Sequence, residues 1–209
     1  MNPLTDEQKK VVIGNAIMEF SEFGFEKTDL EELAEKSQVG IEQIEDAFQD
    51  KEGMFIACVT ESLSYMDSVF AKAKMRRKSI GDVLESLIEQ VQVEAREHPE
   101  YFRLYLQLTA ITTKPQSREI ANLIESSTAR MYLSIFKEAK RGGLIREDID
   151  LKLFSFYFDN MIMMLHFAYC CDYFEERFKV FCGEDIMEKD ELVRQEMMKF
   201  LGGAFGLAE

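Results

Sequence analysis

Only a small set of side chains in this sequence has the chemistry and the spacing that a metal site or a catalytic centre requires. Asp159, His166 and Cys170 share one face of an apolar segment, and each is a possible metal ligand. The step from Asp159 to His166 spans two helical turns, however, and no second metal motif supports the set. The chain has two histidines, His98 and His166, and it carries no phosphate loop, no Gly-x-Ser-x-Gly and no His-Glu-x-x-His motif. We therefore expect no metal, no cofactor and no enzyme activity.

The cysteines and the apolar segments predict a protein of a reducing compartment. The four cysteines show no Cys-x-x-Cys spacing, which suits reduced thiols in a cytosol better than a disulfide framework. The adjacent pair Cys170 and Cys171 could sense oxidants, although most buried cysteines are inert packing groups. No signal-peptide pattern opens the sequence, and the longest uncharged apolar run, near 161–171, is shorter than the roughly 20 residues that a membrane span needs. We expect a cytoplasmic protein without a membrane partner.

The elements that would position these side chains are helices. Three prolines in 209 residues and a hydrophobic fraction of 46% are typical of a helical globular protein. Thr5 with Gln8 and Thr28 with Glu31 have the spacing of capping boxes, and Gly24 lies where the first helix would end. No strand pattern is present, so we predict an all-α protein with about nine helices. The later helices are expected near 99–112, 116–141, 150–173 and 189–205.

Residues 29–48 have the pattern of a helix-turn-helix. Two short apolar stripes at helical spacing flank a turn at 37–40, and the second helix would be the one that enters the major groove of DNA. Three such helices are too few to be stable alone. We therefore predict an N-terminal helix-turn-helix domain over 1–50 and a larger helical ligand-binding and dimerisation domain over 51–209. One helix from about 51 to 78, ending in a basic cluster, would connect the two.

A longer motif connects this helix-turn-helix with a known family. The residues in register are Ala16, Phe20, Gly24, Phe25, Thr28, Leu33, Ala34, Val39, Ile44, Phe48, Lys51, Glu52 and Met54. Over about residues 10–55, without gaps, the chain resembles the N-terminal domain of TetR-family transcriptional regulators. Residues 56–209 are similar to the family only in the layout of their helices. The resemblance implies operator DNA as a partner, a body that binds a small ligand, and a homodimer formed through the last two long helices.

The resemblance also implies which residues would contact DNA. Thr28 would reach a phosphate at the start of the second helix, and Lys51 would do so at the start of the fourth. The third helix, 41–47, would place its N-terminal half against base edges in the major groove. The resulting set of DNA-contacting residues is Lys27, Thr28, Gly40, Ile41, Glu42, Gln43, Glu45 and Lys51.

The charge of this region departs from the family pattern. Residues 1–52 contain five lysines, no arginine and fourteen acids, a net charge of −9 within a chain of −14. The third helix carries Glu42, Glu45 and Asp46 and no cation, and phosphate contacts supply most non-specific affinity for DNA. Acidic side chains can accept from cytosine, so they do not exclude base reading. Two hypotheses stay open: a ligand-responsive repressor that binds operator DNA as a dimer, and a TetR-like ligand- or protein-binding module that has lost DNA binding.

The segment from Phe154 to Phe174 predicts the ligand site. It is apolar on two sides, so it would be buried on two sides, with one face in the dimer and the other lining a pocket. Such a pocket suits an apolar or aromatic small-molecule effector. The alternative for each residue is ordinary core packing. The candidate pocket residues are Phe102, Tyr105, Met131, Phe136, Met163, His166 and Cys170.

Overall fold

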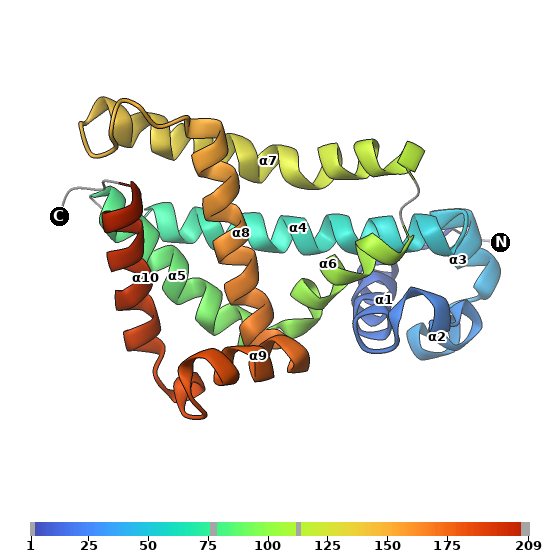
Figure 1. Cartoon of the computed structure of the whole chain (residues 1–209). Coiled ribbons are helices and arrows are strands. Elements are labelled where there is room, and N and C mark those ends of the chain that lie inside the picture. The colour runs from blue at the N-terminus through green and yellow to red at the C-terminus, as the bar shows by residue number, and fades with distance from the viewer. Residues whose placement is uncertain (1–2, 76–78, 112–113, 206–209) are drawn as a thin grey trace. The chain divides into compact units, whose positions relative to one another are not determined.

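The chain is helical throughout the part that its computed structural model describes, residues 3–75, 79–111 and 114–205. Within those residues there are ten α-helices, one 3₁₀ turn and no strand, which confirms the all-α prediction (Figure 1). The elements are α1 (Asp6–Lys27), α2 (Leu30–Ser37), α3 (Ile41–Phe48), α4 (Lys51–Met75), α5 (Ile80–Glu97), α6 (Pro99–Ile111), α7 (Lys114–Arg141), α8 (Leu151–Cys170), α9 (Asp172–Cys182), the 3₁₀ turn (Ile186–Glu188) and α10 (Asp190–Phe205).

The helices form two compact units. The first comprises the residues up to Met66 together with Glu100–Ile120, and the second comprises Asp67–Pro99 together with the residues from Ala121 onward. The chain therefore passes from one unit to the other within α4, at the start of α6 and within α7, and residue 50 lies inside the first unit. The predicted connecting helix is α4, which ends at Met75; positions 76–78 of its basic cluster lie outside the described residues. None of the described helices is long and apolar enough to cross a membrane.

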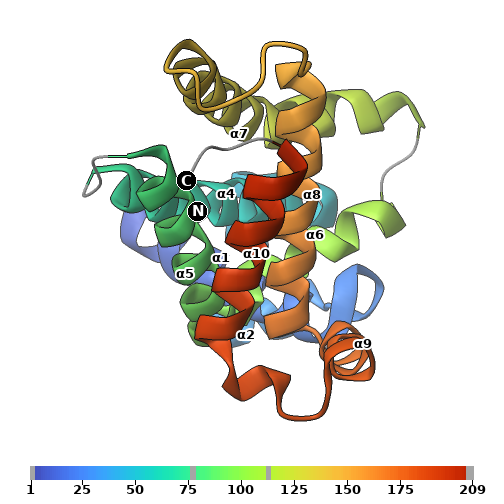
Figure 2. The same cartoon turned by 60° about the vertical axis from the view of Figure 1, so that its left-hand side comes forward.

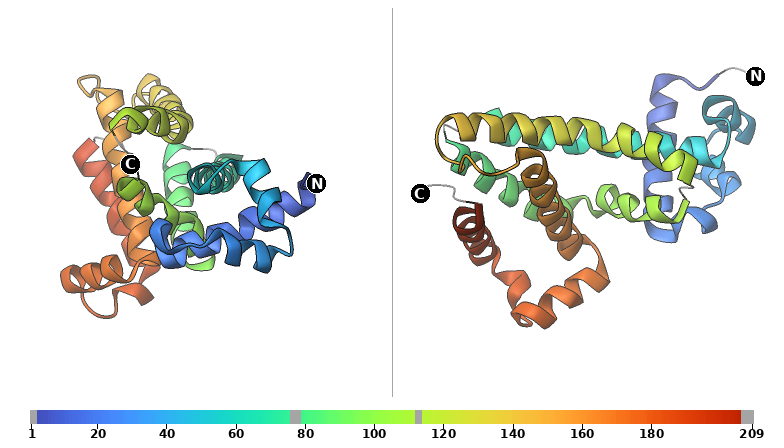
Figure 3. Two further views of the ribbon diagram at one scale, coloured as in Figure 1. Left: turned by 90° about the vertical axis from the view of Figure 1, so that its right-hand side faces the viewer. Right: turned by 45° about the horizontal axis from the view of Figure 1, so that its top comes forward.

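The first unit is built on an aromatic cluster that joins α1 to α4, the two helices that flank the helix-turn-helix. Phe20, Phe25 and Phe55 have ring centroids 5.1–6.0 Å apart, and Phe55 meets the other two edge-on. Edge-to-face pairs stabilise a core beyond the burial of their area. Leu33 and Ile44 bring α2 and α3 into the same buried set, and Figure 3 shows the two helices following one another across a tight turn. The position of α3 is therefore fixed by apolar packing.

The predicted capping box at Thr28 and Glu31 is wrong. Asp29 is the N-cap of α2, and its carboxylate accepts hydrogen bonds from the backbone N–H groups of Glu31 and Glu32 at 2.7 and 3.3 Å. The Thr28 hydroxyl donates instead to the carbonyl of Gly24 at 2.9 Å. Gly24 has a φ of 79° and breaks α1 as predicted. The break leaves the Gly24 carbonyl free to accept the hydrogen bond from the Thr28 hydroxyl.

The second unit has α5 as its centre, with α8 and α10 both packed against it (Figure 2). Its core contains a second aromatic cluster in which Phe136 meets Phe154 and Phe158 edge-on at 4.4 and 5.4 Å. Ser79 caps α5 as its position predicts, because its hydroxyl accepts from the N–H of Asp82. Apolar contacts between these three helices thus build the body of the protein.

A polar network fastens the start of α10 to α5 and α8. The Tyr169 hydroxyl donates to the Asp190 carboxylate at 3.0 Å, and Gln92 donates to both the Tyr169 hydroxyl and the Asp190 carbonyl at 3.0 Å. Arg96 donates to the same carboxylate at 2.7 Å, and its guanidinium lies 4.3 Å from the Tyr169 ring centroid. The Arg96 guanidinium keeps the pKa of Asp190 below its usual range, so this anchor weakens in acid.

Helix α9 was not predicted from the sequence. None of its residues is buried, and Val180 is 82% exposed. Apolar residues recur at helical spacing only where one side of a helix packs on a core. A helix without a buried face therefore lacks this pattern in the sequence. The count of ten helices instead of about nine follows from this element.

Replacing Gly53 by Ala should disrupt the junction between α3 and α4. A Cβ atom at this position would lie 2.0 Å from the backbone oxygen of Phe48, which no side-chain rotation can relieve. We expect a loss of about 2–3 kcal/mol in the free energy of unfolding, in the range of other forced overpacking. Urea titration followed by circular dichroism measures it. Gly14→Ala is the matched control, since a Cβ there meets nothing within 4 Å; equal stabilities of the two variants would contradict the assigned junction.

Candidate functional site

The exposed face of α3 is acidic in the structure as well as in the sequence. Ile44 is buried, whereas Glu42, Glu45 and Asp46 are exposed. Gln43 is committed to the helix start, because its Oε1 accepts from the N–H of Gly40 at 3.0 Å. Ile41 is half-buried beside it. The side chains that α3 offers to solvent are therefore three carboxylates, which repel a phosphate backbone.

The start of α2 is closed to a phosphate by the protein itself. A helix N-terminus binds anions through its free N–H groups, and the Asp29 carboxylate already occupies two of them. Thr28 is 3% exposed, and its single O–H is used by the Gly24 carbonyl. The resemblance implies a phosphate contact for Thr28, and these bonds leave that residue no hydroxyl hydrogen with which to make one.

Of the three lysines between residues 27 and 51, two are engaged within the protein. Lys36 forms an ion pair with the buried Glu19, and this hydrogen bond raises the pKa of Lys36. The Lys51 ammonium donates to the carbonyl of Glu26 at 3.0 Å and lies 5.1 Å from the centroid of the Phe25 ring. Lys27 is exposed, and no hydrogen bond or ion pair holds it among the described residues. Lys27 is thus the cation of this region that is most available to a partner.

The residues predicted to line an effector pocket fall in different parts of the chain. Phe102 and Tyr105 lie on α6 in the first unit, and the former is buried. The other five belong to the second unit: Met131 and Phe136 on α7, and Met163, His166 and Cys170 on α8. Phe136 is fully buried in the aromatic cluster, and Met131 and Met163 are half-buried.

Burial suppresses the acid–base chemistry of His166 on α8. Desolvation lowers the pKa of His166 to about 3, against an opposing hydrogen bond with the Ile162 backbone, so its imidazole is neutral at physiological pH. The Cys170 sulfur lies 3.5 Å from that of Cys171. No group of three or more His, Cys, Asp or Glu side chains is arranged to hold a metal within the described ranges.

The sequence did not reveal that α8 keeps an exposed apolar stripe. Leu153, Phe156, Tyr157 and Met164 are exposed although the segment was expected to be buried on two sides. Phe156 is the most open of them, with 61% of its surface accessible. The sequence shows that the segment is apolar. Which side of α8 becomes buried depends on how α5 packs against it, and the sequence does not show that.

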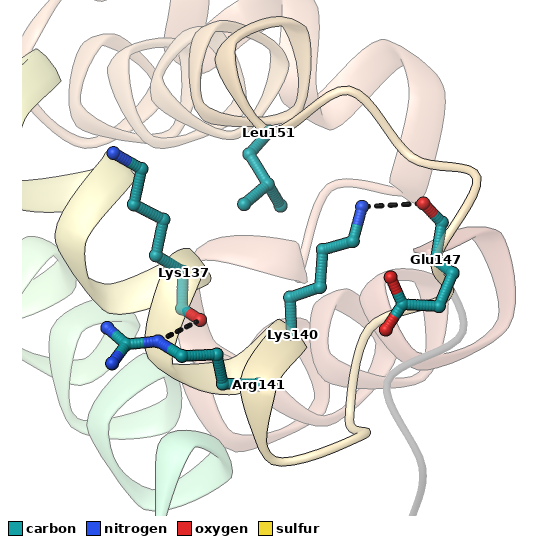
Figure 4. A pocket seen from close by; sticks show the side chains of 5 residues that line it. All are labelled: Lys137, Lys140, Arg141, Glu147 and Leu151. Atoms are coloured by element: carbon teal, nitrogen blue, oxygen red, sulfur yellow. Dashed lines mark hydrogen bonds between the residues drawn. The ribbon is translucent and has the colours of Figure 1, made fainter.

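Two surface cavities in the second unit are lined mainly by charged residues, and none of the predicted pocket residues is among the described residues that line them. The first lies at the end of α7 and is lined by Lys137, Lys140, Arg141, Glu147 and Leu151 (Figure 4). Lys140 bonds the carbonyls of Glu147 and Ile149 at 2.6 and 3.0 Å and so holds the loop before α8. The second lies between α5 and α10, where Arg194 meets Glu85 and Glu89 at 3.7 and 4.0 Å.

Comparison with known proteins identifies the fold. No protein-family model matches the chain. YezE of Bacillus subtilis, described as an uncharacterised HTH-type transcriptional regulator, is 26% identical over 164 residues, covering 75% of this chain and 83% of that protein. A structure from Rhodococcus sp. assigned to the TetR-family regulators has a TM-score of 0.70 at 13% identity and covers 96% of this chain and 100% of that one. The chain has the fold of TetR-family transcriptional regulators.

Two further structures with the TetR-family fold contain ligands. The transcriptional regulator FadR from Bacillus subtilis in complex with stearoyl-CoA has a TM-score of 0.70 at 17% identity, covering 89% of this chain and 95% of that one. AibR in complex with isovaleryl coenzyme A and operator DNA has a TM-score of 0.61 at 16% identity, covering 78% and 85%.

Replacing His166 by Gln should flatten the pH dependence of stability. In an unfolded chain histidine has a pKa of about 6.5, above the folded value of about 3, so acidification protonates the unfolded state first. The stability that neutral His166 contributes is complete above pH 6.5 and is lost progressively as the pH falls toward 3. Between pH 7 and pH 5 the unmodified protein should lose about 2 kcal/mol more than the variant.

Urea unfolding at pH 7, 6 and 5, at one protein concentration, measures this difference. His98→Gln is the matched control because it removes the other histidine, which lies half-buried at the end of α5. Equal pH slopes for H166Q and the unmodified protein would show that His166 is not buried in neutral form.

Proposed function

We propose that this protein is a ligand-responsive transcriptional regulator that binds operator DNA as a homodimer. The observation that carries the proposal is the placement of α3: Ile44, Leu33 and the Phe20–Phe25–Phe55 cluster hold the second helix of a complete helix-turn-helix with its opposite face in solvent. The similarity to YezE and the fold shared with AibR, which was solved with operator DNA, support it. The cytoplasmic location expected from the sequence is part of the proposal.

The exposed stripe of α8 is the basis for the proposed dimer. Leu153, Tyr157 and Met164 recur at near-helical spacing on its solvent side, and Phe156 widens the stripe. Exposed apolar patches on a helical surface commonly mark protein interfaces. Leu192 and Phe200 on α10, also exposed, would add to it. This pairing would use the last two long helices, as the resemblance implies.

The proposed effector site lies in the second unit, beside the aromatic cluster of α7 and α8. Phe136 and Phe158 are fully buried there, and the half-buried Met131 and Met163 are the residues of the predicted set that a ligand could reach with little rearrangement. FadR and AibR were solved with coenzyme A thioesters, which supports a small-molecule effector for this fold. Effector binding would shift α8, and through it the spacing of the two helix-turn-helix regions.

One observation favours a second function, a TetR-fold module that acts through a ligand or a protein without contacting DNA. Asp29 closes the start of α2, Glu42 and Glu45 cover α3, and Lys36 and Lys51 are bound within the protein. A domain with so few free cations can make few phosphate contacts. The two functions differ in a single measurable property, which is the affinity for DNA.

DNA binding by this protein should show a shallow dependence on salt. The phosphate contacts of each protomer would be Lys27 and the two N–H groups of Lys51 that the Glu26 carbonyl leaves free. The slope of log K against log salt should then be about −2 per protomer. Fluorescence anisotropy with the DNA upstream of the protein's own gene, between low and moderate salt, gives this slope. Lys27→Glu should remove about half of it, since this side chain has no other contact. Absence of binding even at the lowest salt would exclude the operator-binding hypothesis and leave the second function.

The double variant Glu42→Lys, Glu45→Lys should raise the affinity for DNA and steepen the slope by about 2 per protomer. Its matched control is Glu184→Lys, Glu188→Lys, which makes the same change in net charge at exposed positions of the second unit. If both double variants gain the same affinity, α3 does not face DNA and only overall charge matters.

Phe156→Glu should weaken the homodimer at least ~30-fold, the effect of losing a central interface residue. The side chain is exposed within its own chain, so the fold of the protomer should be unaffected. Sedimentation velocity across a dilution series measures the dissociation constant. Val11→Glu on α1, another exposed apolar position, should leave it unchanged; a dimer insensitive to Phe156→Glu would contradict an interface on this stripe.

A further inference from the structure

The second unit buries a hydroxyl group that has nothing to bond. Tyr132 on α7 is 1% exposed, and its Oη has no hydrogen-bond partner in the part of the chain that the structure describes. The rings of Phe158, Phe70 and Phe136 surround it, with centroids 5.0, 6.2 and 6.3 Å away. A buried polar group left without a partner costs about 1–3 kcal/mol. A phenylalanine would fill the same space without this cost, which suggests that the hydroxyl serves a purpose other than packing.

A carboxylate for which the described residues supply no partner follows Phe158, whose ring contacts that of Tyr132. Asp159 follows Phe158 on α8 and is half-buried, and no ion pair or hydrogen bond to it is present among the described residues. Burial, and then the charge of Glu125 on α7, raise its pKa to about 6. The group is therefore mostly ionised at neutral pH. Its charge adds to burial in raising the pKa of Tyr132, which places the two groups within electrostatic reach of each other.

The contrast with other acids of the second unit shows that this arrangement is unusual within the protein. Asp150 and Asp190 are each stabilised by N–H donors or by a cation, and both have lowered pKa values for that reason. Asp159 is more buried than either and has no such donor. A buried charge of this kind is tolerated when a bound partner of opposite sign completes it.

The groups at this position select a particular class of partner. Carboxylate and hydroxyl oxygens accept hydrogen bonds, so the partner must donate them, and aromatic faces nearby favour a cation. A metal ion would need further ligands, and no group of three suitable side chains occurs in the described ranges. We propose that Tyr132 and Asp159, with the rings of Phe158 and Phe70, form a subsite that binds the ammonium group of an organic amine.

This inference rests on the proposed effector site and names the chemistry of the effector. Asp159 is half-buried, so an ammonium group could reach it from solvent; Met131, next to Tyr132 on α7, and Met163, one helical turn after Asp159 on α8, are half-buried as well and would offer flexible apolar surface. The amine would thus carry an aromatic or apolar body. Its N–H groups would donate to the Asp159 carboxylate and to the Tyr132 hydroxyl oxygen.

Three small probes of one shape test the inference on the intact protein: 2-phenylethylamine, 2-phenylethanol and 3-phenylpropionate. Isothermal titration calorimetry at pH 7.5 should detect the amine, which is protonated there, at millimolar or better affinity. The alcohol and the carboxylate should each bind at least tenfold more weakly. Equal binding of all three, or no binding of the amine at 10 mM, would overturn the proposal. Either result leaves the DNA and dimer measurements unaffected, so the regulator hypothesis is tested separately.

Variants separate a ligand-binding role from a structural one. Asp159→Asn should weaken amine binding at least tenfold, Tyr132→Phe should weaken it about threefold, and both should raise the melting temperature of the ligand-free protein because an unsatisfied group is removed. Glu184→Gln, an exposed acid of the same unit, is the charge-matched control and should change neither quantity. A lower melting temperature for Asp159→Asn, with amine binding retained, would show that the carboxylate serves only the fold.

Discussion

The organisation of this protein depends on where its surplus of negative charge can be accommodated. Thirty-nine acids face twenty-five lysines and arginines, so many carboxylates need a stabilising partner other than a cation. Helix N-termini supply one: Asp29 and Asp150 accept from backbone N–H groups in the first turn of a helix, and Asp82 accepts from the N–H of the N-cap residue Ser79. Scarce cations serve a few of the rest, as Lys36 does for Glu19 and Arg96 for Asp190. Each such bond stabilises the fold and also removes a charge from the surface available to partners.

The consequences are largest in the helix-turn-helix. Its buried half is complete, because apolar contacts fix α2 and α3 without any help from charge. Its exposed half has the opposite sign from a DNA-binding surface. Lys36 is held by Glu19, and Lys51 by the Glu26 carbonyl and the Phe25 ring, which leaves Lys27 as the exposed cation nearby. Fold and surface chemistry are therefore separable here. The similarity to known regulators concerns the fold, whereas affinity for DNA depends on the chemistry of the surface.

The same imbalance leaves a carboxylate of the second unit uncompensated. Among the residues that the structure describes, Asp159 has neither a helix N-terminus nor a cation as a partner, and the hydroxyl of Tyr132, within its electrostatic reach, has no hydrogen-bond partner either. Elsewhere in the unit, the Arg96–Asp190–Tyr169 network shows how a carboxylate is stabilised when a cation is present. An effector that brings its own positive charge would complete the α7–α8 cluster in the same way. Effector binding and the position of α8, which also carries the proposed dimer surface, would then be coupled.

Much of this architecture could be read from the sequence, and the exceptions share a cause. The bounds of α2 and α3 followed from apolar spacing at Leu33 and Ile44, and the break at Gly24 followed from its residue type, because both signals are local. Asp29 displaced Thr28 as the cap because the Gly24 carbonyl captured the threonine hydroxyl, and α9 was missed because it buries nothing. The lack of a partner at Asp159 was not readable at all, since it depends on what packs around α8 in three dimensions.

A ¹³C NMR titration of the aspartate and glutamate side chains in the intact protein measures the pKa of each carboxyl group. These values show directly which carboxylates have a stabilising partner. The account predicts that Asp159 titrates near pH 6, whereas Asp150, Asp185 and Asp190 titrate below the usual range for aspartate. Titration of Asp159 together with the exposed acids, at an ordinary pKa, would contradict the claim that this protein keeps an uncompensated charge in its second unit.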